Sequence, residues 1–143
     1  MKLGFGSDHA GLELRHQLES WAKEKGHEVH SFGAMSPKSY DYPDAADALC
    51  RRLLEGKLDF GILICGSGIG ISIRANRHLG IRAALCTSPL MAELSRQHNH
   101  ANVLCLGARI TEPDVAKECL DAFLSASPDL GERHVRRIVK LDS

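Results

Sequence analysis

The chain has 143 residues, of which 43% are hydrophobic, and this length suits one compact domain, residues 1–143, with a buried core. Its 18 Lys and Arg residues balance 18 Asp and Glu residues, so no overall charge attracts nucleic acid or an anionic membrane surface. No apolar run reaches the roughly 18 residues of a membrane-spanning helix. We therefore expect a cytoplasmic protein that has neither nucleic acid nor a membrane as its partner.

Short apolar segments alternate with amphipathic ones along the chain. The apolar segments predict β-strands at residues 2–6, 28–32, 60–64, 81–85 and 103–106. The amphipathic segments predict helices at residues 11–25, 42–54, 68–76, 89–97 and 112–124, and a last helix at 131–139. Apolar strands that alternate with helices indicate a parallel sheet covered on both faces. The predicted fold class is α/β, a Rossmann-like three-layer α/β/α sandwich with a five-stranded parallel sheet and an extra C-terminal helix.

The chain contains five cysteines, an odd number without CxxC spacing, which argues against a disulfide framework and against a structural zinc site. We expect reduced thiols. Four of them lie in apolar or helical segments and are predicted to be small core residues: Cys50, Cys86, Cys105 and Cys119. Cys65 differs, because it ends an apolar strand and precedes a glycine-rich turn.

That turn reads Cys65-Gly66-Ser67-Gly68-Ile69-Gly70. In a parallel sheet of this kind ligands bind outside the carboxyl ends of the strands, so the thiol would face a cleft. The glycines would let a substrate approach the backbone amides, which can hold an oxyanion. Two alternatives stay open. The turn could cradle a phosphate, although it lacks the Lys-Ser/Thr of a P-loop, or it could be a tight turn with an inert thiol.

Polar residues follow two other strands at the same edge of the predicted sheet. Asp8 and His9 come after the first strand and bring a carboxylate and an imidazole to the cleft, unless Asp8 only caps the next helix and His9 is exposed to solvent. Arg109 comes directly after the last strand. We expect all three residues to lie near Cys65.

Two further groups lie outside these strand ends. His98 and His100 form an HxH pair, but no third metal ligand stands at a recognisable spacing, so we expect no metal. A general acid/base or hydroxyl-binding role suits His98 better, together with Asn99. Arg133 and Arg137 are four residues apart on one helix face, which suits a phosphate dianion as well as it suits solvated charge.

Seven motifs occur in order between residue 3 and about residue 137. They are Ser7-Asp8-His9-Ala10-Gly11, Asp41-Tyr42-Pro43-Asp44, the run 61–73, Ala75-Asn76-Arg77, Gly80-Ile81-Arg82-Ala83, Ser95-Arg96-Gln97-His98-Asn99 and Arg133-His134-x-x-Arg137. This ordered set, which covers nearly the whole chain, resembles type B ribose-5-phosphate isomerase. The wider family also contains galactose-6-phosphate and allose-6-phosphate isomerases.

The resemblance implies a cofactor-free aldose–ketose isomerisation of a sugar phosphate through a cis-enediolate, with ribose 5-phosphate and ribulose 5-phosphate as the pair. It implies that Cys65 is the base between C1 and C2, that Ser67 assists, and that His98 opens the furanose ring. It implies that backbone amides of the turn bind the enediolate, at Gly66, Gly68, Ile69 and Gly70. It places Asp8 among the catalytic residues, in contact with the sugar hydroxyls, and assigns further contacts with the sugar to His9, Tyr42 and Asn99. It assigns contacts with the phosphate to His9, Arg109, Arg133 and Arg137. It also implies the sheet order 2-1-3-5-4 and a homodimer or homotetramer whose active sites are shared between subunits.

Two residues depart from the family pattern. Ser67 stands where threonine is common in cysteine-bearing members, and it keeps the hydroxyl group. Arg74 stands where a small residue is usual, and we expect its side chain to point outward, away from the cleft.

Other functions stay open at this point. The same chemistry could act on allose 6-phosphate, galactose 6-phosphate or a tetrose 4-phosphate. From another class, a flavodoxin-like nucleotide-binding module would use the glycine turn for phosphate. A thiol redox protein fits less well, because Cys65 has no resolving cysteine nearby in the sequence.

Overall fold

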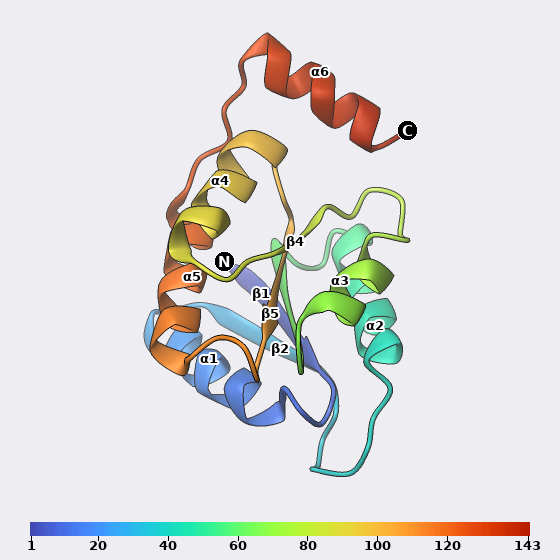
Figure 1. Ribbon diagram of the computed structural model, residues 1–143, viewed down its shortest axis with the longest axis vertical. Helices are drawn as coiled ribbons and strands as arrows, with labels where there is room; N and C mark the ends of the chain where they lie inside the picture. The colour runs from blue at the N-terminus through green and yellow to red at the C-terminus, as the bar shows by residue number, and fades with distance from the viewer.

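Strands and helices alternate along the computed structural model, which describes residues 1–143 (Figure 1). The strands are β1 (Lys2–Ser7), β2 (Glu28–Gly33), β3 (Phe60–Cys65), β4 (Ala83–Leu85) and β5 (Val103–Gly107). The helices are α1 (Leu12–Glu24), α2 (Tyr42–Leu54), α3 (Ile69–Ala75), α4 (Pro89–Asn99), α5 (Pro113–Ser125) and α6 (Glu132–Leu141). Every predicted element is present, in the predicted order. None of the helices has the length and apolar character needed to cross a membrane.

All neighbouring strands of the sheet run parallel, in the order β2-β1-β3-β5-β4. This confirms the order that the family resemblance implies. The register pairs Ser7 with Ile64 and Cys65 with Gly107. The three central strands β1, β3 and β5 therefore finish at nearly the same level, and the loops that follow them share the carboxyl edge of the sheet.

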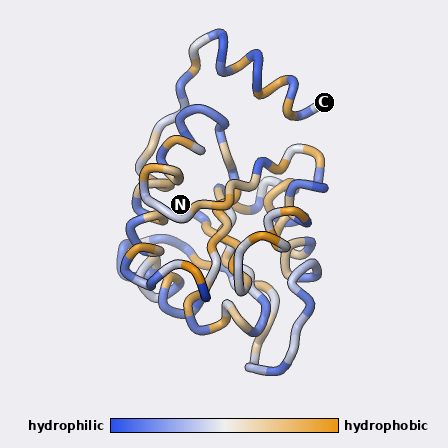
Figure 2. The backbone as a smooth tube through the Cα atoms, in the orientation of Figure 1, coloured by the Kyte–Doolittle hydropathy of each residue, from blue (hydrophilic) through white to orange (hydrophobic).

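Two apolar clusters lie on opposite faces of the sheet. Strand residues such as Phe5 and Ile64 point to one face, where α1, α4 and α5 cover them. Leu63 and Cys105 point to the other face, where α2 and α3 cover them. Figure 2 shows the hydrophobic strands at the centre and the more hydrophilic segments around them. The predicted three-layer sandwich is confirmed, with the four core cysteines buried and free as expected.

The edge strand β4 is shorter than predicted and begins at Ala83 rather than at residue 81. Side-chain amides take the backbone partners at its start: Asn102 Oδ1 accepts from the Arg82 N–H (2.8 Å), and Asn76 Oδ1 accepts from the Ala83 N–H (2.8 Å). These contacts fix the chain before β4 without adding to the ladder of the sheet.

Helix α1 buries two charged residues that its apolar pattern does not predict, Arg15 and Glu19. The Arg15 guanidinium donates to Ser7 Oγ (3.0 Å) and to two carbonyl oxygens at the end of β2, those of Phe32 (2.7 Å) and Ala34 (2.8 Å). Its Nε lies 3.2 Å from Glu19 Oε1. A buried charge is tolerated when it is paired and hydrogen-bonded, and here it ties α1 to the ends of β1 and β2.

Helix α6 lies beyond the amino edge of the sheet, at the top of Figure 1, and contacts the end of α4. An ion pair between Arg82 Nη1 and Asp142 (2.8 Å) ties its C-terminal end to the segment before β4. Several of its apolar side chains stay exposed, including Val139 and Leu141.

Candidate active site

The Cys65 side chain lies at the carboxyl edge, 4% exposed, at the junction of β3 and the glycine-rich turn. The Gly68 N–H donates a hydrogen bond to Cys65 Sγ over 3.2 Å. Gly68 makes this contact with a φ of +79°, and a Cβ at this position would lie 2.9 Å from the carbonyl carbon of Leu106. Only glycine adopts such a turn without strain, so the residue type at position 68 brings an amide to the sulfur.

The loop after β5 is joined to this turn by the backbone. The Ala108 N–H donates to the Cys65 carbonyl (2.9 Å), and the Arg109 N–H donates to the Gly66 carbonyl (2.9 Å). The Arg109 guanidinium lies against Gly66, 3.1 Å from where a Cβ would be. The thiol, the turn and Arg109 are thus parts of one connected unit.

Ser67 and the start of α3 complete the turn. The Ile69 N–H donates to Ser67 Oγ over 3.2 Å. The amides of Gly70 and Ile71 follow in the first turn of α3, where backbone N–H groups have no partner within the helix. Gly70 has Tyr42 against it, since a Cβ there would lie 2.5 Å from Cζ of the tyrosine. Tyr42 therefore covers the turn from the start of α2.

A cavity of about 490 Å³ opens at this edge of the sheet, a volume typical of small-molecule sites. Most of the residues predicted for the site line it together: Asp8, Tyr42, Cys65, Gly66, Ser67, Ile69, Gly70 and Arg109. Ile110 lines it too and was not predicted. Its position directly after Arg109 at a strand end was the available signal.

Asp8 and His9 take different places at this edge. Asp8 is 6% exposed, lines the cavity, and accepts a hydrogen bond from the Gly11 N–H (3.0 Å) just before α1. Asp8 is therefore not the N-cap of α1, which is Gly11, and its carboxylate lines the cavity. His9 does not line the cavity, and its Nδ1 accepts from the Tyr40 N–H (3.1 Å), which ties it to the loop between β2 and α2.

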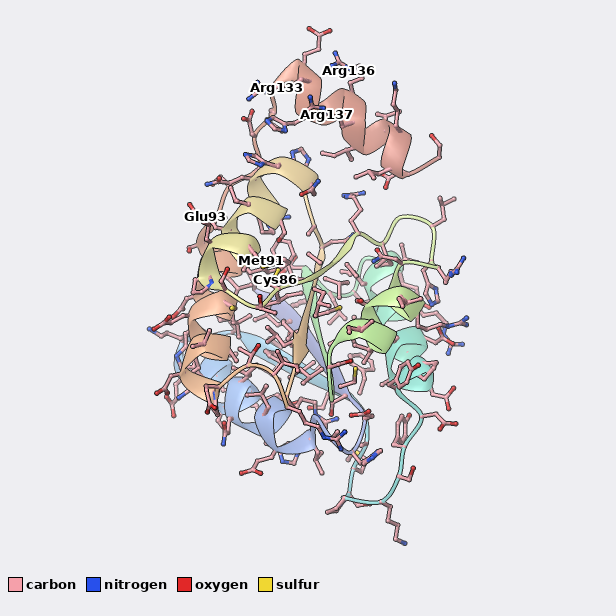
Figure 3. The ribbon with its side chains drawn as sticks, in the orientation of Figure 1. Cys86, Met91, Glu93, Arg133, Arg136 and Arg137 are labelled. Atoms are coloured by element: carbon pink, nitrogen blue, oxygen red, sulfur yellow. The ribbon has the colours of Figure 1, made fainter.

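The remaining predicted residues lie at the opposite edge of the sheet. His98 and Asn99 end α4, which runs from the carboxyl edge back to the amino edge, and Arg133 and Arg137 project from α6 (Figure 3). None of the four lines the cavity at Cys65. A single chain therefore does not bring its two groups of predicted residues together.

Two residues near His98 were missed by the sequence reasoning. The ring of His134 stacks on the ring of His98, with centroids 4.8 Å apart and planes 10° apart. The Oδ2 atom of Asp129 lies 3.4 Å from Nε2 of the His134 ring. His134 stands inside the Arg133-His134-x-x-Arg137 motif, so the signal was present without a role attached to it. Asp129 had no signal beyond its position before a helix.

The other four cysteines differ from Cys65 in their surroundings. Burial raises the pKa of Cys50 to about 12 and the pKa of Cys86 and of Cys119 to about 11. Burial also raises the pKa of Cys105 well above its usual value. These four thiols stay protonated at neutral pH and line no cavity with Asp8 or Ser67, so they are not candidates for a reactive thiol.

Arg74 points away from the cavity, as expected. Its guanidinium holds the Asp47 carboxylate with two hydrogen bonds, Nε to Oδ1 (2.7 Å) and Nη2 to Oδ2 (2.9 Å). His78 Nε2 lies 2.7 Å from the same Oδ1. The cluster joins α2, which carries Tyr42, to α3, which begins at the turn after Cys65.

This cluster predicts a pH dependence of stability. The hydrogen bond from Arg74 is the main cause that lowers the pKa of Asp47 below its usual value. A carboxyl group with a lowered folded pKa stabilises the protein above its unfolded pKa of about 4, and this contribution is lost as the pH falls through the folded pKa. We expect Asp47→Asn to unfold at lower urea concentration than the wild type at pH 7, and the difference to shrink at acid pH.

The measurement is urea unfolding of both proteins at a series of pH values. Asp121→Asn, on the exposed face of α5 and without an ion pair, is the matched control and should show no such change. A difference between Asp47→Asn and the wild type that persists unchanged at low pH would show that the carboxylate charge is not its source.

Comparison with known proteins shows the family to which the chain belongs. A family model described as Ribose/Galactose Isomerase matches residues 3–141. The chain is 44% identical to ribose-5-phosphate isomerase B of Escherichia coli strain K12, over 96% of this chain and 91% of that protein. It is 38% identical to D-erythrulose-4-phosphate isomerase of Pectobacterium atrosepticum, over 88% of this chain and 84% of that protein.

Solved structures are similar along nearly the whole chain. The structure of ribose 5-phosphate isomerase from Thermotoga maritima superposes with a TM-score of 0.96 at 48% identity, covering 99% of this chain and 97% of that one. Ribose-5-phosphate isomerase B of Clostridium thermocellum superposes with a TM-score of 0.96 at 44% identity, covering 99% and 95%. The match of fold, family model and sequence extends from one end of the chain to the other, and the chain belongs to the ribose/galactose isomerase family.

Proposed function

We propose that this chain is an aldose–ketose isomerase that interconverts ribose 5-phosphate and ribulose 5-phosphate through a cis-enediolate, without a cofactor. The observation that carries the proposal is the position of the Cys65 thiol, which lines a cavity beside a turn rich in backbone amides. The relatives named as ribose-5-phosphate isomerases support this substrate pair. They favour an isomerase over a flavodoxin-like nucleotide-binding module.

The reaction needs a base and a site for a transient negative charge. Cys65, as a thiolate, takes the C2 proton of the open-chain aldose, and the electron pair moves to the C1 oxygen. A proton then passes from the C2 hydroxyl to the C1 oxygen, so that the negative charge lies on the C2 oxygen, and return of the proton from Cys65 to C1 leaves a carbonyl at C2. Backbone amides of the turn and of the start of α3 stabilise the enediolate, and one such donor contributes about 3 kcal/mol. Ser67 assists from the same cavity with its hydroxyl group.

The other cavity residues hold the sugar. Asp8 and Tyr42 face the substrate hydroxyls, while Arg109 offers positive charge to the phosphate, and His9, held by the Tyr40 N–H, contacts the sugar and the phosphate from the loop after β1. Binding the phosphate away from the reacting carbons lets that binding energy orient C1 and C2 toward the thiol.

A second copy of the chain completes each site. The partner subunit's His98 opens the furanose ring, the partner's Asn99 contacts the sugar, and Arg133 and Arg137 of the partner subunit bind the phosphate. Two observations support this arrangement: the two groups lie at opposite edges of one chain, and α3, next to the cavity, exposes the apolar side chains of Ile69 and Ile73. A two-fold pair in which opposite edges meet would form two equivalent sites, as a homodimer or within a homotetramer.

We also place the enzyme in the cytoplasm. All five cysteines are free, which suits a reducing compartment.

Side-by-side assays test the choice of substrate. We expect kcat/KM for ribose 5-phosphate to exceed kcat/KM for allose 6-phosphate, galactose 6-phosphate and erythrose 4-phosphate by about tenfold or more, a ratio that one added or missing carbon can produce. One relative is named D-erythrulose-4-phosphate isomerase, so the comparison of ribose 5-phosphate with the tetrose phosphate is the most informative of these assays. A higher kcat/KM on a tetrose or hexose phosphate would overturn the ribose assignment and leave the chemistry in place.

A further inference from the structure

His134 joins α6 to the end of α4 through a ring stack. It lies in the first half of α6, 5% exposed, and its ring is nearly parallel to the exposed ring of His98. A histidine in the last turn of a helix, surrounded by solvent, would be free to rotate about both side-chain torsions. The stack against a buried ring removes most of this freedom and sets the plane of the His98 ring.

The buried ring is itself held in place. His134 Nε2 lies 3.4 Å from Asp129 Oδ2 and accepts from Arg133 Nε at 3.4 Å. Burial is the main cause that lowers the pKa of His134; the charges of His98, Arg133 and Arg137 add to it, and Asp129 opposes it.

Asp129 connects this ring to both helices. Its N–H donates to the Gln97 carbonyl (2.8 Å), and its carbonyl lies 2.8 Å from His100 Nε2. Its Oδ1 accepts from the Gly131 N–H (2.7 Å) at the start of α6. The segment between α5 and α6 is therefore anchored on the same turn of α4 that carries His98.

We propose that His134 is a positioning residue, which orients the His98 ring for opening of the furanose form of the substrate. The inference rests on the proposed function, in which His98 opens the ring. It predicts an effect on the ring-opening step alone, because His134 touches His98 and lines no part of the cavity at Cys65.

Two measurements separate ring opening from proton transfer. Conversion of ribose 5-phosphate requires both steps, because this aldose is mainly a furanose in solution. Exchange of the C1 hydrogen of ribulose 5-phosphate with D2O requires only the second step. The ketose is open-chain, Cys65 removes the hydrogen, the thiol exchanges with solvent, and deuterium returns to C1.

We expect His134→Ala to lower kcat for ribose 5-phosphate about tenfold, the scale of a misplaced catalytic group, while the exchange rate from NMR stays near the wild-type rate. His134→Phe keeps a flat ring for the stack and should have a kcat close to that of the wild type. This variant also tests the stack if the alanine variant folds poorly. His98→Ala is the reference for loss of ring opening. His30→Ala, on the edge strand β2, is the matched control and should change neither rate.

The outcomes are distinguishable. If His98→Ala itself lowers conversion and exchange alike, or lowers neither, the proposed role of His98 fails. If His98→Ala lowers only conversion and His134→Ala has no effect, the positioning role of His134 fails alone. If His134→Ala lowers both rates or raises KM in both measurements, His134 acts on phosphate binding or on docking of α6, and the inference is overturned. Failure of His134→Phe to recover kcat would overturn the stack as the cause.

Discussion

Replacing Cys65 with alanine should lower kcat for ribose 5-phosphate by about a thousandfold or more, within the range that a general base contributes. The variant removes the only group in the cavity at the end of β3 that can carry the proton between C1 and C2 as a thiolate. Cys65→Ser should be similarly inactive, because a serine hydroxyl is far too weak an acid to ionise at neutral pH. Initial rates in both directions measure the loss.

Binding should survive this change. The amides of the turn, Asp8 and Arg109 stay in place, so the Kd of ribulose 5-phosphate from calorimetry should change by no more than about threefold. Cys119→Ala, which removes a buried thiol on α5 at a distance from the cavity, is the control and should keep full turnover. Turnover by Cys65→Ala at the wild-type rate would remove Cys65 from its catalytic role and reopen the nucleotide-binding alternative.

Mixing two inactive variants should restore activity. In a two-fold pair, a site built from Cys65 of one chain and His98 of the other survives only in a mixed pair of Cys65→Ala and His98→Ala chains. One of the two sites in that pair carries both substitutions, and the other carries neither. With random exchange half of the pairs are mixed and each has one intact site, so ribose 5-phosphate turnover should reach about a quarter of the wild-type value.

Coexpression of the two chains with different affinity tags isolates the mixed pair for assay. Each variant alone, and the two mixed without subunit exchange, give the baseline. A mixture of Cys65→Ala with Ser67→Ala is the matched control, since both substitutions lie in the same half of the site and no intact site can form. Activity no higher than the baseline in the purified mixed pair would contradict the shared site.

The fold was predictable from the sequence because its strands are short, apolar and separated by amphipathic helices. β3 and β5 are buried along nearly their whole length, which the apolar runs 60–64 and 103–106 indicate directly. The start of β4 was not predictable, because side-chain amides of Asn76 and Asn102, on segments before and after the strand, accept from its first backbone N–H groups. Burial of Arg15 was equally hidden, since its hydrogen-bond acceptors lie at the ends of β1 and β2 rather than on its own helix.

The carboxyl-edge half of the site followed from topology. Residues directly after β1, β3 and β5 had to meet, and Asp8, Cys65 and Arg109 do line one cavity. The position of His98 at the other edge follows from the direction of α4. Its stack with His134 depends on the course of the chain between α5, which ends at Ser125, and α6, and the pattern of apolar residues does not predict that course.

The sheet of each chain stands between its own thiol and its own stacked imidazoles. In the proposed assembly, a newly folded monomer is inactive until it associates with a second chain, so activity depends on an association step that is second order in protein concentration. Specific activity toward the cyclic sugar then falls on dilution below the dissociation constant of the pair and recovers on concentration. The architecture thereby makes the abundance of the protein itself a determinant of its rate per chain.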